Sequence, residues 1–185
     1  FDDTRIPTEA TQRGYRPYDL LFMGDNGSNG ASCEAILPLL QDGKVTKGYG
    51  GSLFFIAAMW NDKMQTVTDL TAWGKGSDGD ERTLDLGDNS SFYQGLVTTK
   101  WNNNYSNGGS PHDVSDVDTD FFLFRVAEAY LNAAEAEMHL NGESSTKAKG
   151  YIDILRKRAH TATSDSYNLN YILDERSREF YFEGL

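Results

Sequence analysis

Two aromatic residues stand among glycines, which leaves their rings free to lie against a ligand. Tyr49 has glycines on both sides, and Trp73 is followed by one. Because glycine has no side chain, a neighbouring ring can stand clear of the backbone. Sugars have CH-rich faces and hydroxyl edges, and a large, stiff ring with one polar tip can lie against such a face. We therefore expect Tyr49 and Trp73 to stack on a ligand, with ordinary packing as the alternative.

A third aromatic residue, Tyr105, lies in an asparagine-rich run, residues 102–107. The amide groups of this run, that of Asn103 among them, could hydrogen bond to hydroxyl groups along a groove. An exposed linker is the alternative. For Trp60 and Trp101, which end an apolar run and a strand-like run, burial is favoured. The candidate ligand-binding residues are thus Tyr49, Trp73, Tyr105 and Asn103.

No spacing in the sequence indicates catalysis, a cofactor or a metal site. A glycosidase needs two carboxylates flanking one bond, and composition cannot place such a pair. Phosphate-binding and nucleophile motifs are absent, and the three histidines and one cysteine fit no metal-ligand spacing. Four aspartates could offer calcium hard oxygen ligands, but they lack the central glycine and distal glutamate of an EF-hand, so helix capping and solvation are favoured. These four are Asp113, Asp116, Asp118 and Asp120.

Composition limits the partners of this 185-residue chain. Its net charge of −11 argues against nucleic acid and against adsorption to an anionic membrane surface. The longest apolar run, residues 53–60, is far shorter than the roughly 18 residues that a membrane span needs. A single cysteine rules out an internal disulfide. The first residue is not methionine and the last lie within a helix-like pattern, so we expect a piece of a longer chain.

The elements that position the candidate residues change in character near residue 119. Residues 1–118 are rich in Gly, Asn, Asp, Ser and Thr and predict long loops with short strands and helices. Within them, residues 95–101 alternate as a strand does, and residues 32–44 could begin as a helix that Pro38 disturbs. Ordered loops commonly present side chains, so we assign residues 1–118 to ligand binding.

Residues 119–185 predict a helical scaffold, with helices near 119–140, 147–160 and 170–183. Apolar residues recur every three or four positions in each, which places them on one face. A short connection makes the first two helices antiparallel, as in the hairpins that tetratricopeptide repeats stack. The fold class is therefore mainly α, with tetratricopeptide-like hairpins and a long loop-rich segment. The residues expected to face inward on the first two helices are Phe124, Ala127, Leu131, Ala134, Met138, Tyr151, Ile152, Leu155 and Ala159. On the third helix, one shared face is expected to hold Ile172, Leu173, Arg176 and Phe180.

Charged residues also recur on these helices at spacings that favour ion pairs between helices. Such pairs belong to a scaffold more often than to a binding site. The residues concerned are Arg125, Glu128, Glu135, Glu175, Arg176 and Arg178.

Three motifs of the helical part resemble the C-terminal region of the SusD/RagB family, which are glycan-binding lipoproteins of Bacteroidetes outer membranes. They are DTDFFLFRVAEAYLNAAEA (118–136), ILRKRAH (154–160) and DERSREFYFEGL (174–185). In the loop half, GYGGSLFFIAAMWNDKM and AWGKG resemble the starch-binding branch. By that resemblance Tyr49 and Trp73 occupy the positions of its sugar-stacking aromatic residues.

The resemblance implies non-catalytic capture of an oligosaccharide or polysaccharide, such as starch, at the bacterial cell surface. It implies a SusC-like TonB-dependent transporter as partner, and an outer-membrane location through an N-terminal lipid anchor outside this chain. One alternative is a helical-repeat module that binds a peptide and no sugar. Another is a polysaccharide-cleaving enzyme, which would need a carboxylate pair beside the aromatic platform.

Overall fold

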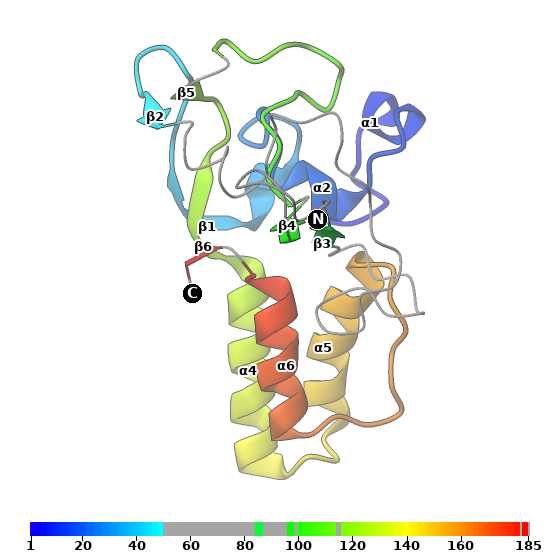
Figure 1. Cartoon of the computed structure of the whole chain (residues 1–185). Coiled ribbons are helices and arrows are strands. Elements are labelled where there is room, and N and C mark those ends of the chain that lie inside the picture. The colour runs from blue at the N-terminus through cyan, green and yellow to red at the C-terminus, as the bar shows by residue number, and fades with distance from the viewer. Residues whose placement is uncertain (50–83, 87–95, 99, 114–115, 182, 185) are drawn as a thin grey trace.

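The computed structural model describes residues 1–49, 84–86, 96–98, 100–113, 116–181 and 183–184. Figure 1 shows three long helices beneath a part made of short helices, strands and loops. The helices are α4 (Val126–Asn141), α5 (Thr146–Arg158) and α6 (Leu169–Glu179). We call residues 126–180 the helical unit, and the described part of residues 1–125 the loop unit.

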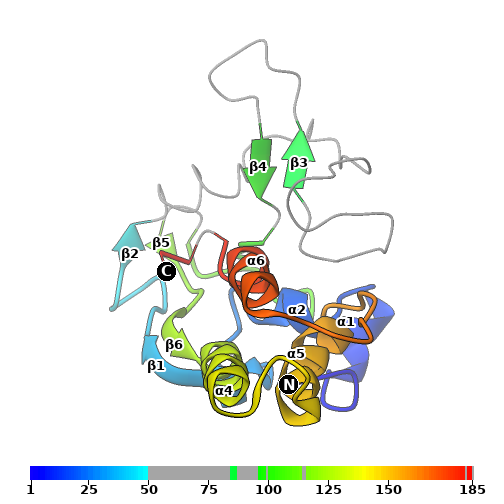
Figure 2. The same cartoon turned by 90° about the horizontal axis from the view of Figure 1, so that it is seen from below.

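The helical unit forms where the sequence predicts helices. Ser145 and Asn168 cap α5 and α6, since their side-chain oxygens accept hydrogen bonds from the backbone N–H groups of Ala148 and Tyr171. Helix α4 ends before Gly142, whose φ of 85° favours glycine. Viewed nearly end-on in Figure 2, the three helices lie at the corners of a triangle. The buried faces meet in one apolar cluster made by Ala127, Leu131, Ala134, Met138, Ala148, Ile152, Leu155, Tyr167, Ile172 and Phe180.

The predicted start of the first helix at residue 119 is wrong. Phe121–Arg125 form strand β6, which pairs antiparallel with β1 (Ala35–Leu39), and α4 begins only at Val126. Phe124 is consequently 45% exposed instead of buried with the helices. Aromatic and apolar residues in a row favour a strand once a partner strand is present, and a run this short carries no decisive period. The other two helices end earlier than expected, at Arg158 and Glu179. The placement of Leu173 on the packed face of the third helix is also wrong: this residue is 60% exposed, because it is turned by about 100° around the helix axis from the buried Ile172.

The loop unit contains short elements around a second apolar core. Its helices are α1 (Thr8–Gln12), α2 (Pro17–Leu20) and the 3-10 helix η1 (Ala31–Glu34), so the expected helix near residue 32 is one turn that leads into β1. Strand β2 (Gly48–Tyr49) pairs antiparallel with β5 (Asp116–Val117), and β3 (Leu84–Leu86) with β4 (Leu96–Thr98). Strand β4 confirms the strand expected within residues 95–101.

Trp101 is buried in this core, as predicted. Its ring stacks on that of Phe121 with centroids 5.3 Å apart, and it meets Phe22 edge-on at 5.1 Å. Trp101 therefore ties the strand-like run to β6 and to the chain after α2.

Buried asparagine and aspartate side chains connect the loops of this unit. Asn26 is fully buried: its Nδ2 donates to the carbonyl groups of Leu21 (2.8 Å) and Asp120 (2.9 Å), and its Oδ1 accepts from the backbone N–H of Asp120 (2.9 Å). Asp25 accepts from the backbone N–H and hydroxyl of Ser106, at 3.0 and 2.7 Å. The loop that begins at Met23, expected to present its side chains, thus turns several of them inward.

A buried ion cluster lies where the two units meet. Arg125 is 0% exposed; its guanidinium donates to Glu183 at 2.7 Å and to Glu179 at 2.5 Å. Lys100 pairs with Glu183, while Arg158 pairs with Glu179 and, at 2.8 and 2.6 Å, with Glu34. We call these residues, Glu34, Lys100, Arg125, Arg158, Glu179 and Glu183, the junction cluster.

The prediction of ion pairs between helices is confirmed for one pair of the residues named and is wrong in its partners for Arg125. That side chain reaches the carboxylates of Glu179 and Glu183, and neither Glu128 nor Glu135 on the following helix is its ion-pair partner. Arg176 binds Glu135 at 3.1 Å and so joins α6 to α4, as predicted. Arg178 binds Glu175 at 2.8 Å, three residues earlier on the same helix.

Candidate functional site

Three of the four candidate ligand-binding residues contact strand β5 or the residue after it, Asp118. The backbone of Tyr49, at the end of β2, pairs with Asp116. The side-chain oxygen of Asn103 accepts from the backbone N–H of Asp118 at 2.9 Å, and the Tyr105 hydroxyl donates to the Asp118 carboxylate at 2.8 Å. Trp73 and Trp60 lie outside the described residues. In Figure 1, β2 and β5 lie at the top of the loop unit, and the helical ends farthest from that unit, such as the C-terminal end of α4, lie at the bottom.

Asp118 forms the centre of this arrangement. The residue is only 5% exposed; Oδ2 accepts from Tyr105 and from the backbone N–H of His112 (2.7 Å), and Oδ1 lies 3.0 Å from His112 Nδ1. The chain at Gly43 passes so close that a Cβ there would come within 2.6 Å of Asp118 Oδ1, and its φ is 62°. We call Asn103, Tyr105, His112 and Asp118, with the backbone of Tyr49, the β5 cluster.

The Tyr105 ring is partly buried and held on several sides. A Cβ at Gly24 would lie 3.1 Å from one ring edge and a Cβ at Gly109 3.0 Å from the other, so two glycines make room for the ring. The ring of His112 approaches it edge-on at 6.3 Å between centroids. Burial and the hydrogen bond to Asp118 raise the pKa of the Tyr105 hydroxyl to about 12, so it remains a donor at neutral pH.

Asn103 lies beneath the surface of the cluster. The residue is 2% exposed, and besides accepting from Asp118 its side chain donates through Nδ2 to the Asp113 carbonyl at 3.2 Å. The oxygen and the nitrogen of the side-chain amide therefore both bind the backbone near the end of the loop, at Asp118 and Asp113. Asn103 can thus position these two residues.

The four aspartates weighed as calcium ligands serve separate local bonds. Asp113 accepts from the backbone N–H of Asp116 (3.1 Å), Asp116 pairs with Lys47 (3.1 Å), and Asp120 accepts from the backbone N–H of Gln41 (2.8 Å). Among the residues that the structure describes, no three His, Cys, Asp or Glu side chains are grouped to hold a metal ion. Nor does any helix in this part of the chain have the length and apolar character to cross a membrane.

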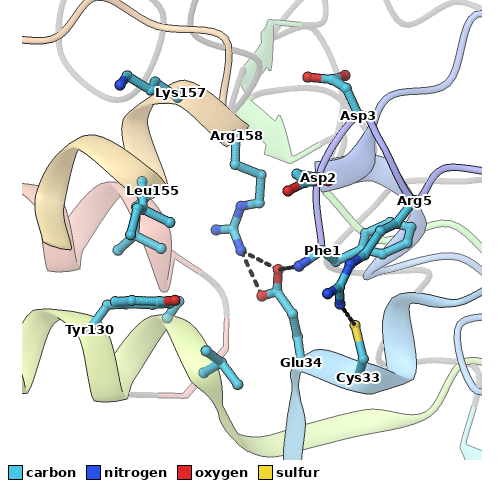
Figure 3. A pocket seen from close by; sticks show the side chains of 13 residues that line it. Phe1, Asp2, Asp3, Arg5, Cys33, Glu34, Tyr130, Leu155, Lys157 and Arg158 are labelled. Carbon is cyan, nitrogen blue, oxygen red and sulfur yellow. Dashed lines mark hydrogen bonds and ion pairs between the residues drawn. The ribbon is translucent and has the colours of Figure 1, made fainter. Parts of the chain in front are cut away.

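The structure also contains a pocket of about 450 Å³ beside the junction cluster, shown in Figure 3. Helices α4 and α5 supply an apolar wall that includes Tyr130 and Leu155, and the first residues of the chain supply charged groups. On its floor the Glu34 carboxylate binds the guanidinium group of Arg158. Because Glu34 and Arg158 both belong to the junction cluster and already pair with each other, we regard the pocket as part of the junction. No pattern in the sequence indicates this pocket, since Glu34 and Arg158 are distant along the chain.

Comparison with known proteins gives a consistent match. Residues 41–185 match the model of the SusD family. The starch-binding protein SusD of Bacteroides thetaiotaomicron is 31% identical over an alignment 234 positions long, which covers 90% of this chain and 42% of that protein. The chain therefore spans less than half the length of this relative.

Solved structures show the same fold. Surface glycan-binding protein A from Bacteroides uniformis superposes with a TM-score of 0.55 at 20% identity, covering 92% of this chain and 39% of that one. A SusD superfamily protein from Parabacteroides distasonis gives a TM-score of 0.60 at 14% identity, covering 90% and 40% respectively. At such identities the likeness concerns the fold alone.

Proposed function

The chain belongs to the SusD family, and we propose that it forms part of a non-catalytic protein that binds glycans at the bacterial cell surface. The observation that carries this proposal is the β5 cluster. Residues that the sequence indicates as sugar-binding candidates, up to 56 positions apart (49 to 105), converge on residues 116–118 at the end of the molecule opposite the helical tips.

We further propose starch or another α-1,4-glucan as the ligand, in line with the name of the 31% identical relative. Such a glucan curves, so two rings set at an angle can follow its arc, each against the face of one glucose. Tyr49 and Trp73 are the proposed stacking residues and Tyr105 a third aromatic contact. Asn103, being buried, contributes by fixing the loop that carries Tyr105.

The remaining proposals concern the whole protein. Residues 1–118 form the binding segment and residues 119–185 the scaffold. In the scaffold, the antiparallel pair α4–α5 is one tetratricopeptide-like hairpin, and α6 is the first helix of the next. A SusC-like TonB-dependent transporter in the outer membrane receives the glycan, and a lipid anchor outside this chain holds the protein at the cell surface. The antiparallel packing of α4 with α5 and the contact of α6 with α4 support the scaffold proposal.

Truncating Trp73 tests the proposed function. In the full-length protein, Trp73→Ala should weaken binding of maltoheptaose about ten-fold or more, because a stacked ring contributes roughly 1–3 kcal/mol in comparable base–aromatic contacts. Isothermal titration calorimetry measures the affinity, and circular dichroism shows whether the variant is folded. Leu173→Ala, at an exposed position on α6, is the control and should bind as the wild type does.

Two results would count against this proposal. A folded Trp73→Ala protein with unchanged affinity removes Trp73 from the site. A wild-type protein that shows no retardation by any member of a polysaccharide panel in affinity electrophoresis removes the glycan-binding function.

A further inference from the structure

The β5 cluster contains one side chain to which the sequence pattern assigns no site. His112 lies between the Tyr105 ring and the turn at residues 42–46, and its side chain is 41% exposed. Most of the polar groups around it are occupied: Asp118 by three donors, and the Asp42 carboxylate by the backbone N–H groups of Lys44, Val45 and Thr46. These bonds lower the pKa of Asp42 and keep it an acceptor.

One ring nitrogen of His112 is anchored to two acceptors. Nδ1 lies 2.9 Å from the carbonyl oxygen of Asp42 and 3.0 Å from Oδ1 of Asp118. A carbonyl oxygen can only accept, so Nδ1 must carry the hydrogen. In the neutral imidazole the other nitrogen, Nε2, then holds a lone pair, and its direction is fixed by the anchored ring.

Nothing in the described part of the chain uses that lone pair. Nε2 of His112 has no hydrogen-bond partner among the described residues, although the same ring makes two bonds through Nδ1. A fixed acceptor at a partly exposed position, beside an aromatic ring, matches what the edge of a sugar requires. Hydroxyl groups donate there while the sugar face lies against a ring.

We propose that His112 is a glycan-contacting residue, whose Nε2 accepts a hydrogen bond from a sugar hydroxyl group. Asp118 and the Asp42 carbonyl fix the ring for this role, and the ligand is a neutral, hydroxyl-bearing sugar, because carboxylates surround the position. The inference rests on the proposed function and adds to it a residue that determines how the sugar edge is held.

Two amide substitutions in the full-length protein separate anchoring from contact. The Asn side chain in His112→Asn can place its N–H group where Nδ1 was and keep the bond to Asp118, but has no atom at the position of Nε2. The longer Gln side chain in His112→Gln can place its amide near the Nε2 position. We expect His112→Asn to weaken maltoheptaose binding about three- to ten-fold, as the loss of one hydrogen bond does, and His112→Gln to recover part of it.

The control is His139→Asn on α4, another exposed histidine, which should bind maltoheptaose as the wild type does. A readout on the unaltered protein completes the test: ¹⁵N spectra of the histidine rings should show the Nε2 resonance of His112 shifting on addition of maltoheptaose. An unshifted Nε2 resonance in a glucan-bound protein, or a His112→Asn variant with wild-type affinity, overturns the inference and leaves the proposed function intact. Absence of glucan binding by the wild type overturns both.

Discussion

The helical unit and the loop unit are stabilised in different ways. In the helical unit, apolar side chains at regular spacing meet in a single cluster, and capping side chains act within three residues of their targets. In the loop unit, buried amides and carboxylates bridge segments that are far apart, as Asn26 and Asp120 do over 94 positions. A periodic pattern in the sequence can therefore reveal the first kind of structure, while the second becomes visible only when the segments meet.

The junction cluster joins these two parts, and its loss should have the largest effect on stability. Arg125→Ala leaves the carboxylates of Glu179 and Glu183 buried without their shared partner, which should lower the free energy of unfolding by about 3–5 kcal/mol. Urea denaturation followed by circular dichroism measures this change. Arg176→Ala, which removes a more exposed pair with Glu135, should cost less than about 1 kcal/mol. If both variants lost the same free energy of unfolding, the buried ion pairs of Arg125 would not stabilise the junction more than an exposed pair does.

A smaller effect is expected inside the loop unit. Asn26→Ala removes the partners of three buried backbone groups, on Leu21 and Asp120, and should lower the free energy of unfolding by about 2–3 kcal/mol. Asn104→Ala, at an exposed position, should stay within about 0.5 kcal/mol of the wild type. If both variants unfold at the same urea concentration as the wild type, buried amides do not hold this unit together.

The smallest effect is a pH dependence at the junction. Burial lowers the pKa of Lys100 from 10.5 to about 8, although Glu183 opposes the shift. The unfolded chain then holds this proton to higher pH than the folded protein, so the free energy of unfolding should rise as the pH goes from about 8 to about 10, by roughly 1 kcal/mol per pH unit near pH 9. Denaturation at several pH values measures the slope. Lys100→Met should flatten it, and an equal slope in both proteins would contradict the assignment to Lys100.

The contrast between locally determined helices and loops joined by distant residues also explains which features the sequence can predict. The three helices and the burial of Leu131, Leu155 and Phe180 follow from local spacing. The expected burial of Phe124 is wrong because four residues of aromatic and apolar type fit a helical turn and a strand equally, and only the distant β1 decides between them.

The candidate site is predictable in its residue types and less so in its arrangement. Glycine and asparagine neighbours single out Tyr49 and Tyr105, and the structure brings both to β5 and Asp118. The exposure of a candidate residue is harder to predict. Asn103 resembles a surface amide in the sequence, whereas in the fold its side chain is hydrogen bonded to the backbone of Asp113 and Asp118. His112 carries no signal in the sequence, because its anchoring depends on Asp42, 70 positions away.

Hydrogen–deuterium exchange of the full-length protein, with and without saturating maltoheptaose, tests most directly whether the loop unit binds and the helical unit supports. We expect the glucan to slow exchange in peptides covering residues 42–49 and 103–118, and to leave peptides covering residues 126–179 unchanged. Protection confined to α4, α5 or α6, with none around β5, would contradict this division of roles.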